Sequence, residues 1–144
     1  MNKELIRNLK YSLYVHGSKK LISSFILIDP FSQTIKSYED KISKVNKRAA
    51  IRDALIQGAK TLREIDIKDV DIFVSNNHVV DILQNQKVKH HEMMDFYKYF
   101  HRIMEGINWE LIKIPVEQNK ADCDYLPSLS FQKITDKIIK RIKN

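Results

Sequence analysis

The chain has 144 residues, of which 43% are hydrophobic and 30% charged, a composition typical of one globular domain with a sizeable core. The formal net charge of +7 favours polyanionic partners such as nucleic acid, although lysines spread along the whole chain also suit an ordinary solvated surface. A single cysteine excludes an internal disulfide, and no stretch approaches the roughly 18 apolar residues of a membrane span, so we expect a cytoplasmic protein.

Three segments rich in strand-forming residues begin the chain: Leu9–Val15, Leu21–Ile28 and Thr34–Ile42. The first is expected to end at the turn that starts with His16, and the second at Asp29, which precedes a proline. Because the polar turns between the segments are short, they predict an antiparallel meander.

The hydrophobic period then changes to that of a helix. Within Lys47–Glu64 the apolar residues recur at spacings of three and four, which predicts an amphipathic helix. Gly58 falls on the same stripe, where the absence of a side chain lets the helix lie close to a sheet. Val70–Val74 is a short apolar run typical of a buried strand. Asn77–Leu83 is predicted as a short helix and Gln84–Lys89 as a loop.

The last third of the chain predicts helix, strand and helix. His90–Glu105 carries apolar residues at helical spacing and stops at Gly106, and Ile107–Ile114 follows as a strand. Leu126–Ile142 predicts an amphipathic helix. Its apolar side holds Phe131, Ile134, Ile138 and Ile142, and its basic side holds Lys133, Lys137, Lys140, Arg141 and Lys143.

This order of elements predicts an α/β architecture, a mixed five-stranded sheet with three antiparallel strands followed by parallel strands. Strand–helix–strand crossovers place the later strands parallel, with helices on both faces. We expect a single domain over residues 1–144, in which 127–144 is an additional basic C-terminal helix. That helix either has an ordinary solvated lysine face or acts as a phosphate-contacting arm.

Three local motifs follow one another along the chain in an order that is characteristic of a known family. They are Ala54-Leu-Ile-Gln-Gly58, Asp71-Ile-Phe-Val-Ser-Asn-Asn-His-Val-Val-Asp81 and Ile114-Pro-Val-Glu-Gln-Asn-Lys-Ala-Asp122. Together they resemble ribonuclease H type 1, especially its short bacterial and reverse-transcriptase-like branch, over roughly Lys10 to Leu126. The third motif is one residue shorter between its Asn and Ala than the family pattern. The resemblance implies a ribonuclease H-like fold for the predicted sheet and helices.

Members of that family cut the RNA strand of RNA–DNA hybrids with two divalent metals held by four acidic residues. The acids are needed because Mg²⁺ prefers hard oxygen ligands and because two cations about 4 Å apart activate water and stabilise the leaving oxygen. Carried over to this chain, the four positions are His16, Ile51, Ser75 and Asp122, with Asn76 replacing Ser75 if the register shifts by one. Only Asp122 retains a carboxylate.

One carboxylate facing a formal charge of +4 leaves strong uncompensated repulsion between the metals, so we predict no Mg²⁺-dependent cleavage and no bound metal. Rescue by other acids is not expected. Asp53 lies about 200° around the helix from Ile51. Asp81 lies deeper in its own helix, and Asp124 stands two residues beyond Asp122.

The sequence therefore predicts a catalytically degenerate, non-catalytic nucleic-acid-binding module whose ligand is RNA–DNA hybrid, duplex or single strand. Salt-sensitive phosphate contacts are expected from basic residues. The candidate contacts are Lys19, Lys20, Asn76, Asn77 and Lys120. Two alternatives stay open: a protein-interaction or homodimer scaffold on the same fold, and a residual nuclease that uses Mg²⁺ or Mn²⁺.

Other polar groups have ordinary interpretations. His91 and Asp95 share a helix face, but a solvated helix start accounts for them better than a metal site. His16 with Asp122 is a possible transition-metal pair, yet a hydrogen-bonding histidine is commoner at a strand end. Cys123 is expected to be a small buried residue, not a nucleophile.

Overall fold

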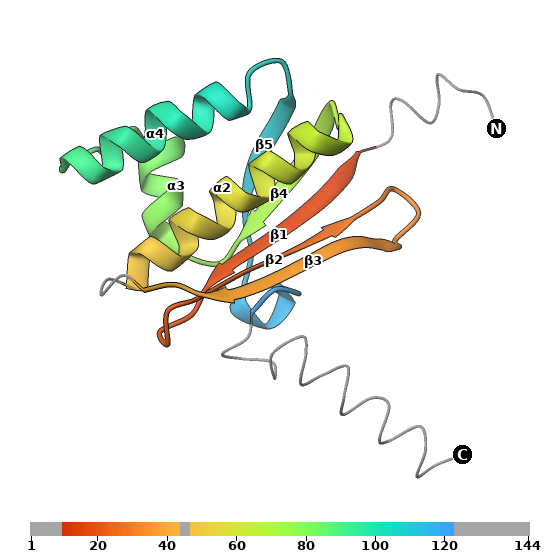
Figure 1. Cartoon of the computed structure of the whole chain (residues 1–144), viewed down its shortest axis with the longest axis horizontal. Coiled ribbons are helices and arrows are strands. Elements are labelled where there is room, and N and C mark those ends of the chain that lie inside the picture. The colour runs from red at the N-terminus through yellow and green to blue at the C-terminus, as the bar shows by residue number, and fades with distance from the viewer. Residues whose placement is uncertain (1–9, 44–46, 123–144) are drawn as a thin grey trace, which may run out of the picture.

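The computed structural model describes residues 10–43 and 47–122, which are drawn in colour in Figure 1. The strands are β1 (Tyr11–Gly17), β2 (Ile22–Ile28), β3 (Thr34–Lys41), β4 (Asp69–Val74) and β5 (Asn108–Lys113). The helices are α2 (Lys47–Ile65), α3 (Asn77–Leu83), α4 (His91–Ile103) and the short 3₁₀ helix η1 (Val116–Gln118). In the described residues no helix is both long and apolar enough to cross a membrane.

The five strands form one mixed sheet in the order β3-β2-β1-β4-β5. The pairs β1–β2 and β2–β3 are antiparallel, whereas β1–β4 and β4–β5 are parallel. This confirms the predicted meander followed by parallel crossovers. Because β1 and β4 are parallel neighbours inside the sheet, their carboxyl ends lie side by side, and side chains that follow the two strands can meet there.

The predicted boundary of the first strand was wrong. His16 and Gly17 were expected in a turn, but both belong to β1, where they pair with Ser24 and Ser23 of β2. The ladder continues past the apolar run because β2 supplies backbone partners there, a long-range effect that the local sequence does not carry. The other described strands and the three α-helices match their predicted ranges to within two residues, and α3 matches without any difference, whereas η1 was not predicted.

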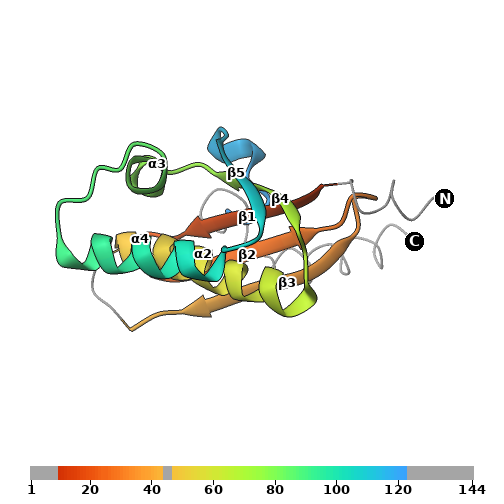
Figure 2. The same ribbon diagram turned by 90° about the horizontal axis from the view of Figure 1, so that it is seen from above.

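All three described α-helices pack against the same face of the sheet, so the expected helices on both faces are not found among residues 10–43 and 47–122. Their apolar sides form one cluster with inward residues of the strands, including Leu13, Ile72 and Leu111. Helices α2 and α4 run side by side over this face, as both views show (Figures 1 and 2). Gly58 allows the close approach expected of it, since a Cβ there would lie 2.8 Å from Cδ2 of Leu13.

The opposite face carries a second, smaller cluster, in which Ile26 and Ile28 of β2 pack with Ala121 and Tyr14. The segment after β5 reaches this cluster through η1. The basic helix predicted for 127–144 lies outside the described residues, as do Cys123 and Asp124.

Candidate functional site

Four positions that are far apart in the sequence meet at the carboxyl end of β1. His16 is the second-to-last residue of that strand, Ser75 directly follows β4, and Asp122 follows η1. Ile51 lies in α2, whose backbone passes so close to Gly17 that a Cβ there would be 2.2 Å from the Ile51 nitrogen. The fold therefore brings His16, Ile51, Ser75 and Asp122 to one place.

The centre of this place is a contact between a histidine and a carboxylate. His16 Nε2 lies 3.2 Å from Oδ1 of Asp122, and the two side chains are only 11% and 3% exposed. One oxygen of the Asp122 carboxylate thus already faces an imidazole nitrogen. An imidazole is a good ligand for transition metals and a poor one for Mg²⁺.

Asn119 builds the loop that positions Asp122. Its buried amide nitrogen donates to the Val15 carbonyl at 3.0 Å and to Ser75 Oγ at 3.1 Å, which joins the loop to the ends of β1 and β4. Its Oδ1 accepts from the Ala121 backbone, and its carbonyl accepts from the Asp122 backbone. Sequence reasoning included this asparagine in a motif but gave it no role, because its partners are more than 40 residues away in the chain.

The remaining two positions hold neutral side chains. Ile51 is 2% exposed and belongs to the main apolar cluster, so it offers no oxygen ligand at this place. Ser75 contributes a hydroxyl that accepts from Asn119. Within residues 10–43 and 47–122, no group of three or more His, Cys, Asp or Glu side chains is arranged to hold a metal ion. The donor set therefore does not fit a pair of magnesium ions.

Two of the acids considered as substitutes have other partners. Asp53 accepts weakly from Tyr38 Oη and from the Gln57 amide, both at 3.4 Å, and lines a groove beside α4. Asp81 accepts from the Asn85 amide at 3.2 Å. Asp124 lies outside the described residues.

Beside Ser75 the surface opens into a polar pocket of about 560 Å³, here called the Ser75 pocket. The start of α2, the loop after β4, helix α3 and the α3–α4 loop form its walls. Its lining residues are Arg48, Ser75, Asn76, Asn77, His78, Asp81, Ile82, Lys87, Lys89 and Met93. Three cationic side chains against one carboxylate give the pocket a positive character, which suits a phosphate or another anion.

His78 is the buried titratable group of this pocket. Burial, followed by the neighbouring charges of Arg52 and Arg48, lowers the pKa of His78 to about 4, and Asp81 opposes that shift only in part. The imidazole is therefore neutral at pH 7. Arg52 Nη1 lies 2.9 Å from His78 Nε2, and because a guanidinium only donates, Nε2 is the accepting nitrogen.

The residues predicted to contact nucleic acid do not all gather here. Asn76 and Asn77 line the Ser75 pocket, although the Asn76 side chain also caps α3 by accepting from the His78 backbone at 2.6 Å. Lys19 and Lys20 lie exposed in the β1–β2 turn, and Lys120 lies over the Tyr14 ring on the other face of the sheet. None of these three lysines lines the pocket.

Sequence reasoning missed the cations that do line the pocket, Arg48, Lys87 and Lys89. Lys87 and Lys89 flank a valine in a loop that was noted only as polar, and Arg48 is one of several basic residues near the start of α2. Because basic residues are spread along the whole sequence, these three did not stand out as a group. They become a group only because α2 and the α3–α4 loop meet beside Ser75.

Comparison with solved structures places this arrangement among known folds. No family model matches the chain, and no curated protein matches it in sequence. The N-terminal RNase H domain of Rv2228c from Mycobacterium tuberculosis, solved as a fusion with maltose binding protein, aligns with a TM-score of 0.73 at 14% identity. That alignment covers 81% of this chain and 90% of the other. The chain has the ribonuclease H fold.

Two further structures agree with this assignment. LC11-RNase H1, solved in complex with an RNA/DNA hybrid, aligns with a TM-score of 0.71 at 19% identity, over 80% of this chain and 92% of the other. RNase H1 from the halophilic archaeon Halobacterium salinarum aligns with a TM-score of 0.66 at 13% identity, over 77% and 88%. The expected ribonuclease H-like fold is confirmed.

Proposed function

We propose that this protein is a catalytically degenerate ribonuclease H-like module that binds nucleic acid without cutting it. The observation that carries the proposal is the His16–Asp122 contact, with Ile51 buried beside it, at the sheet edge where the fold gathers the four positions. A two-metal centre needs several oxygen ligands at this edge, and the residues present supply one carboxylate.

Electrostatics support the loss of metal chemistry. Two Mg²⁺ ions bring a formal charge of +4, and at separations of about 4 Å their repulsion needs several carboxylates to offset it. His16 and Ser75 carry no formal negative charge, and Ile51 offers no lone pair. A metal bound at Oδ1 of Asp122 would also compete with the contact to His16 Nε2.

The Ser75 pocket supports binding. Arg48, Lys87 and Lys89 offer charge-assisted donors to phosphate oxygens, and Asn77 adds a neutral polar group at the same rim. Such contacts release counterions, so the affinity falls steeply as salt rises. An RNA–DNA hybrid is the first ligand to test, since a similar structure holds one.

One experiment tests binding and cleavage together. The full chain is incubated with labelled RNA–DNA hybrid, double-stranded RNA, double-stranded DNA and single strands, each with Mg²⁺, with Mn²⁺ and with chelator. We expect retention of nucleic acid that survives chelation, weakens with salt and leaves every strand intact. Salt-insensitive binding, or no binding to any of these ligands, contradicts the proposal.

The same assay separates the proposal from a residual nuclease. Metal-dependent cutting of the hybrid that disappears in Asp122→Asn would make this protein an active enzyme and overturn the degenerate assignment. Cutting that persists in Asp122→Asn would identify a contaminating nuclease instead. A matched Asp124→Asn variant controls for the loss of one negative charge two residues along the chain.

A further inference from the structure

A groove with an apolar floor lies between the end of β3, helix α2 and the start of α4, and it is here called the acidic groove. Its volume of about 580 Å³ is within the range of pockets that hold ligands. Buried Ala49 and Phe96 and half-buried Ile56 line the floor, and Tyr99 adds an aromatic ring that is 44% exposed. Such a surface favours an apolar group from a partner.

Four carboxylates from three elements converge on this floor: Asp40 of β3, Asp53 of α2, and Glu92 and Asp95 of α4. Asp40 and Asp53 both lie beside the hydroxyl group of Tyr38, whose Oη is 3.4 Å from Oδ2 of Asp53. A phenol hydroxyl offers these two carboxylates one proton to share and no positive charge. Their negative charge is therefore not neutralised by Tyr38.

The cations of the groove compensate this charge only in part. Arg52 Nη2 lies 3.3 Å from Glu92, but Nη1 of the same guanidinium contacts His78 outside the groove at 2.9 Å. Lys41 is the other lining cation, and it is exposed at the end of β3. The groove thus keeps an excess of negative charge, although the whole chain carries a formal charge of +7. Charge complementarity favours a cationic partner.

We propose that the acidic groove docks a short basic segment of another protein, in which one apolar side chain stands between lysine or arginine residues. The apolar side chain contacts Phe96 and Tyr99, and the flanking cations reach Asp40 on the β3 side and Asp95 on the α4 side. The methylene stems of the lysines lie along the apolar floor. This docking does not rest on the proposed binding of nucleic acid, and either proposal survives the failure of the other.

An NMR titration of the full-length protein both locates and measures the docking. The probes are three pentapeptides with blocked ends: Lys-Lys-Leu-Lys-Lys, Lys-Lys-Ser-Lys-Lys and Glu-Glu-Leu-Glu-Glu. We expect the first peptide to shift the backbone signals of groove residues such as Asp53 and Tyr99. The second should bind about threefold more weakly, because it buries no apolar side chain, and the third should not bind.

Three results of this titration overturn the proposal. The first is the absence of any shift with Lys-Lys-Leu-Lys-Lys, and the second is a set of shifts that lie outside the groove. The third is a set of groove signals that move with protein concentration in the absence of peptide, since that result assigns the groove to a second copy of this chain.

A matched pair of charge reversals tests whether the location of the charge matters. Asp40→Lys with Asp95→Lys reverses two exposed carboxylates of the groove, and Glu64→Lys with Glu105→Lys makes the same change of net charge at exposed positions outside it. We expect the first pair to weaken binding of Lys-Lys-Leu-Lys-Lys about tenfold and the second pair about twofold at most. Equal weakening would show that only the net charge of the protein matters and would contradict the docking.

A second matched pair tests the apolar contact. Tyr99 and Met94 are both exposed on α4, but only Tyr99 lines the groove. We expect Tyr99→Ser to weaken the leucine peptide about threefold while the affinity for the serine peptide changes little, and Met94→Ser to alter neither. A loss in Tyr99→Ser that is the same for both peptides, or no loss, would contradict the apolar contact.

Discussion

The Ser75 pocket has a counterpart of almost equal size and opposite charge. This second hollow, the acidic groove, has a volume of about 580 Å³ and lies between the end of β3, α2 and the start of α4. Its lining residues are Asp40, Lys41, Ile42, Ser43, Ala49, Arg52, Asp53, Ile56, Glu92, Asp95, Phe96 and Tyr99. Four carboxylates stand against two cations there, whereas the Ser75 pocket has three cations and one carboxylate.

Size therefore does not distinguish the two hollows, but electrostatics does. One titratable group beside each hollow has a pKa that is shifted mainly by burial. The neighbouring charges are negative beside the acidic groove and positive in the Ser75 pocket, so they shift the two pKa values in opposite directions. Burial, Asp53 and Asp40 raise the pKa of Tyr38 to about 12 beside the acidic groove. Burial, Arg52 and Arg48 lower the pKa of His78 to about 4 in the Ser75 pocket.

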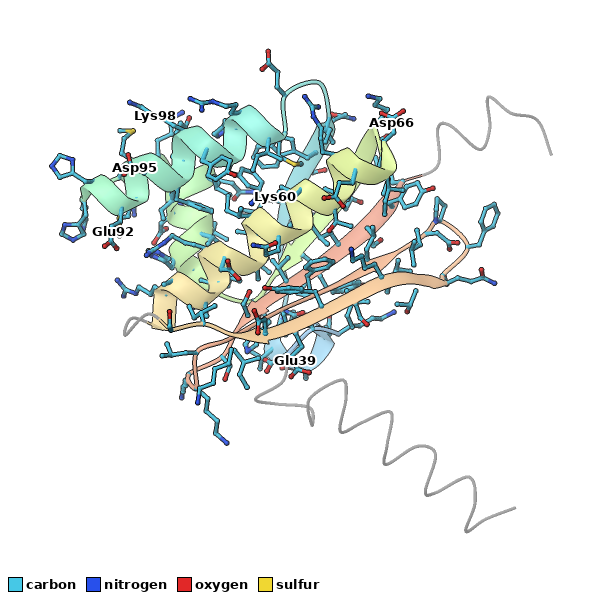
Figure 3. All side chains as sticks on the ribbon, in the orientation of Figure 1. Glu39, Lys60, Asp66, Glu92, Asp95 and Lys98 are labelled. Carbon is cyan, nitrogen blue, oxygen red and sulfur yellow. The ribbon has the colours of Figure 1, made fainter. Side chains whose placement is uncertain are left out.

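A single residue joins the two regions. Arg52 lines the acidic groove, where its Nη2 lies 3.3 Å from Glu92, and its Nη1 contacts His78 in the other hollow. Glu92 and Asp95 project from the start of α4, on the groove side (Figure 3). A polyanion is expected to bind on the Ser75 side and to be repelled on the groove side.

The largest expected effect comes from the packing of Gly17 against the start of α2, the helix that contributes residues to both hollows. Gly17→Ala places a Cβ 2.2 Å from the Ile51 backbone nitrogen, so the start of α2 must move. We expect a loss of about 3 kcal/mol in the free energy of unfolding, measured by denaturant titration. Gly106→Ala is the control: its φ of +84° disfavours alanine, but no atom outside its chain neighbours comes nearer than 4.0 Å, so its cost is about 1 kcal/mol. Equal losses would contradict the close packing at Gly17.

A smaller effect is expected in the pH dependence of the free energy of unfolding, to which His78 of the Ser75 pocket contributes. Because the folded-state pKa of His78 is about 4 and the ordinary value is 6.5, the unfolded chain binds more protons between these values. The contribution of His78 to stability is complete above pH 6.5 and declines as the pH falls toward 4. The pKa difference of 6.5 − 4 = 2.5 corresponds to at most about 3 kcal/mol, and because the imidazole is not fully shielded from solvent we expect a loss of about 2 kcal/mol across this window.

The measurement is the free energy of unfolding at several pH values. His78→Gln should flatten the slope between pH 6.5 and 4, leaving the part that His101 contributes, since burial also lowers the pKa of His101. An unchanged slope in His78→Gln would show that the imidazole is not held neutral by its surroundings.

The smallest effect separates the two hollows as binding surfaces. Arg48→Glu with Lys89→Glu should weaken the binding of RNA–DNA hybrid about tenfold, because two phosphate-attracting charges are reversed. Asp40→Lys with Asp95→Lys reverses the groove instead and should leave the affinity equal or slightly higher. Lys60→Ala with Lys98→Ala removes exposed cations elsewhere on α2 and α4 (Figure 3) and should have little effect. The measurement is the dissociation constant at one fixed salt concentration.

Much of the fold follows from local patterns. The short polar turns between the first three segments predicted the meander, the change to a helical period near Lys47 predicted the first crossover, and Asn77–Leu83 predicted α3 without error. The motif ending at Asp122 joined this residue to the other three positions only through the resemblance. These signals are local because the apolar spacing reflects which face of each element is buried.

The site was predicted less fully because its partners are distant. His16, Ile51, Ser75 and Asp122 were named from a resemblance, and the structure brings them together. The role of Asn119 and the cationic lining of the Ser75 pocket were missed. No short window of sequence contains both Asn119 and Val15, or both Arg48 and Lys89.

By itself, the sequence determined the order and type of the elements and the residue types at positions 16, 51, 75 and 122, because periodicity and residue identity are properties of the chain. Only the tertiary structure decided that His16 faces Asp122 and that the cations of α2 and the α3–α4 loop share one hollow. The physical reason is that electrostatic interactions act over a few ångströms in space, and parallel crossovers bring together residues that are tens of positions apart.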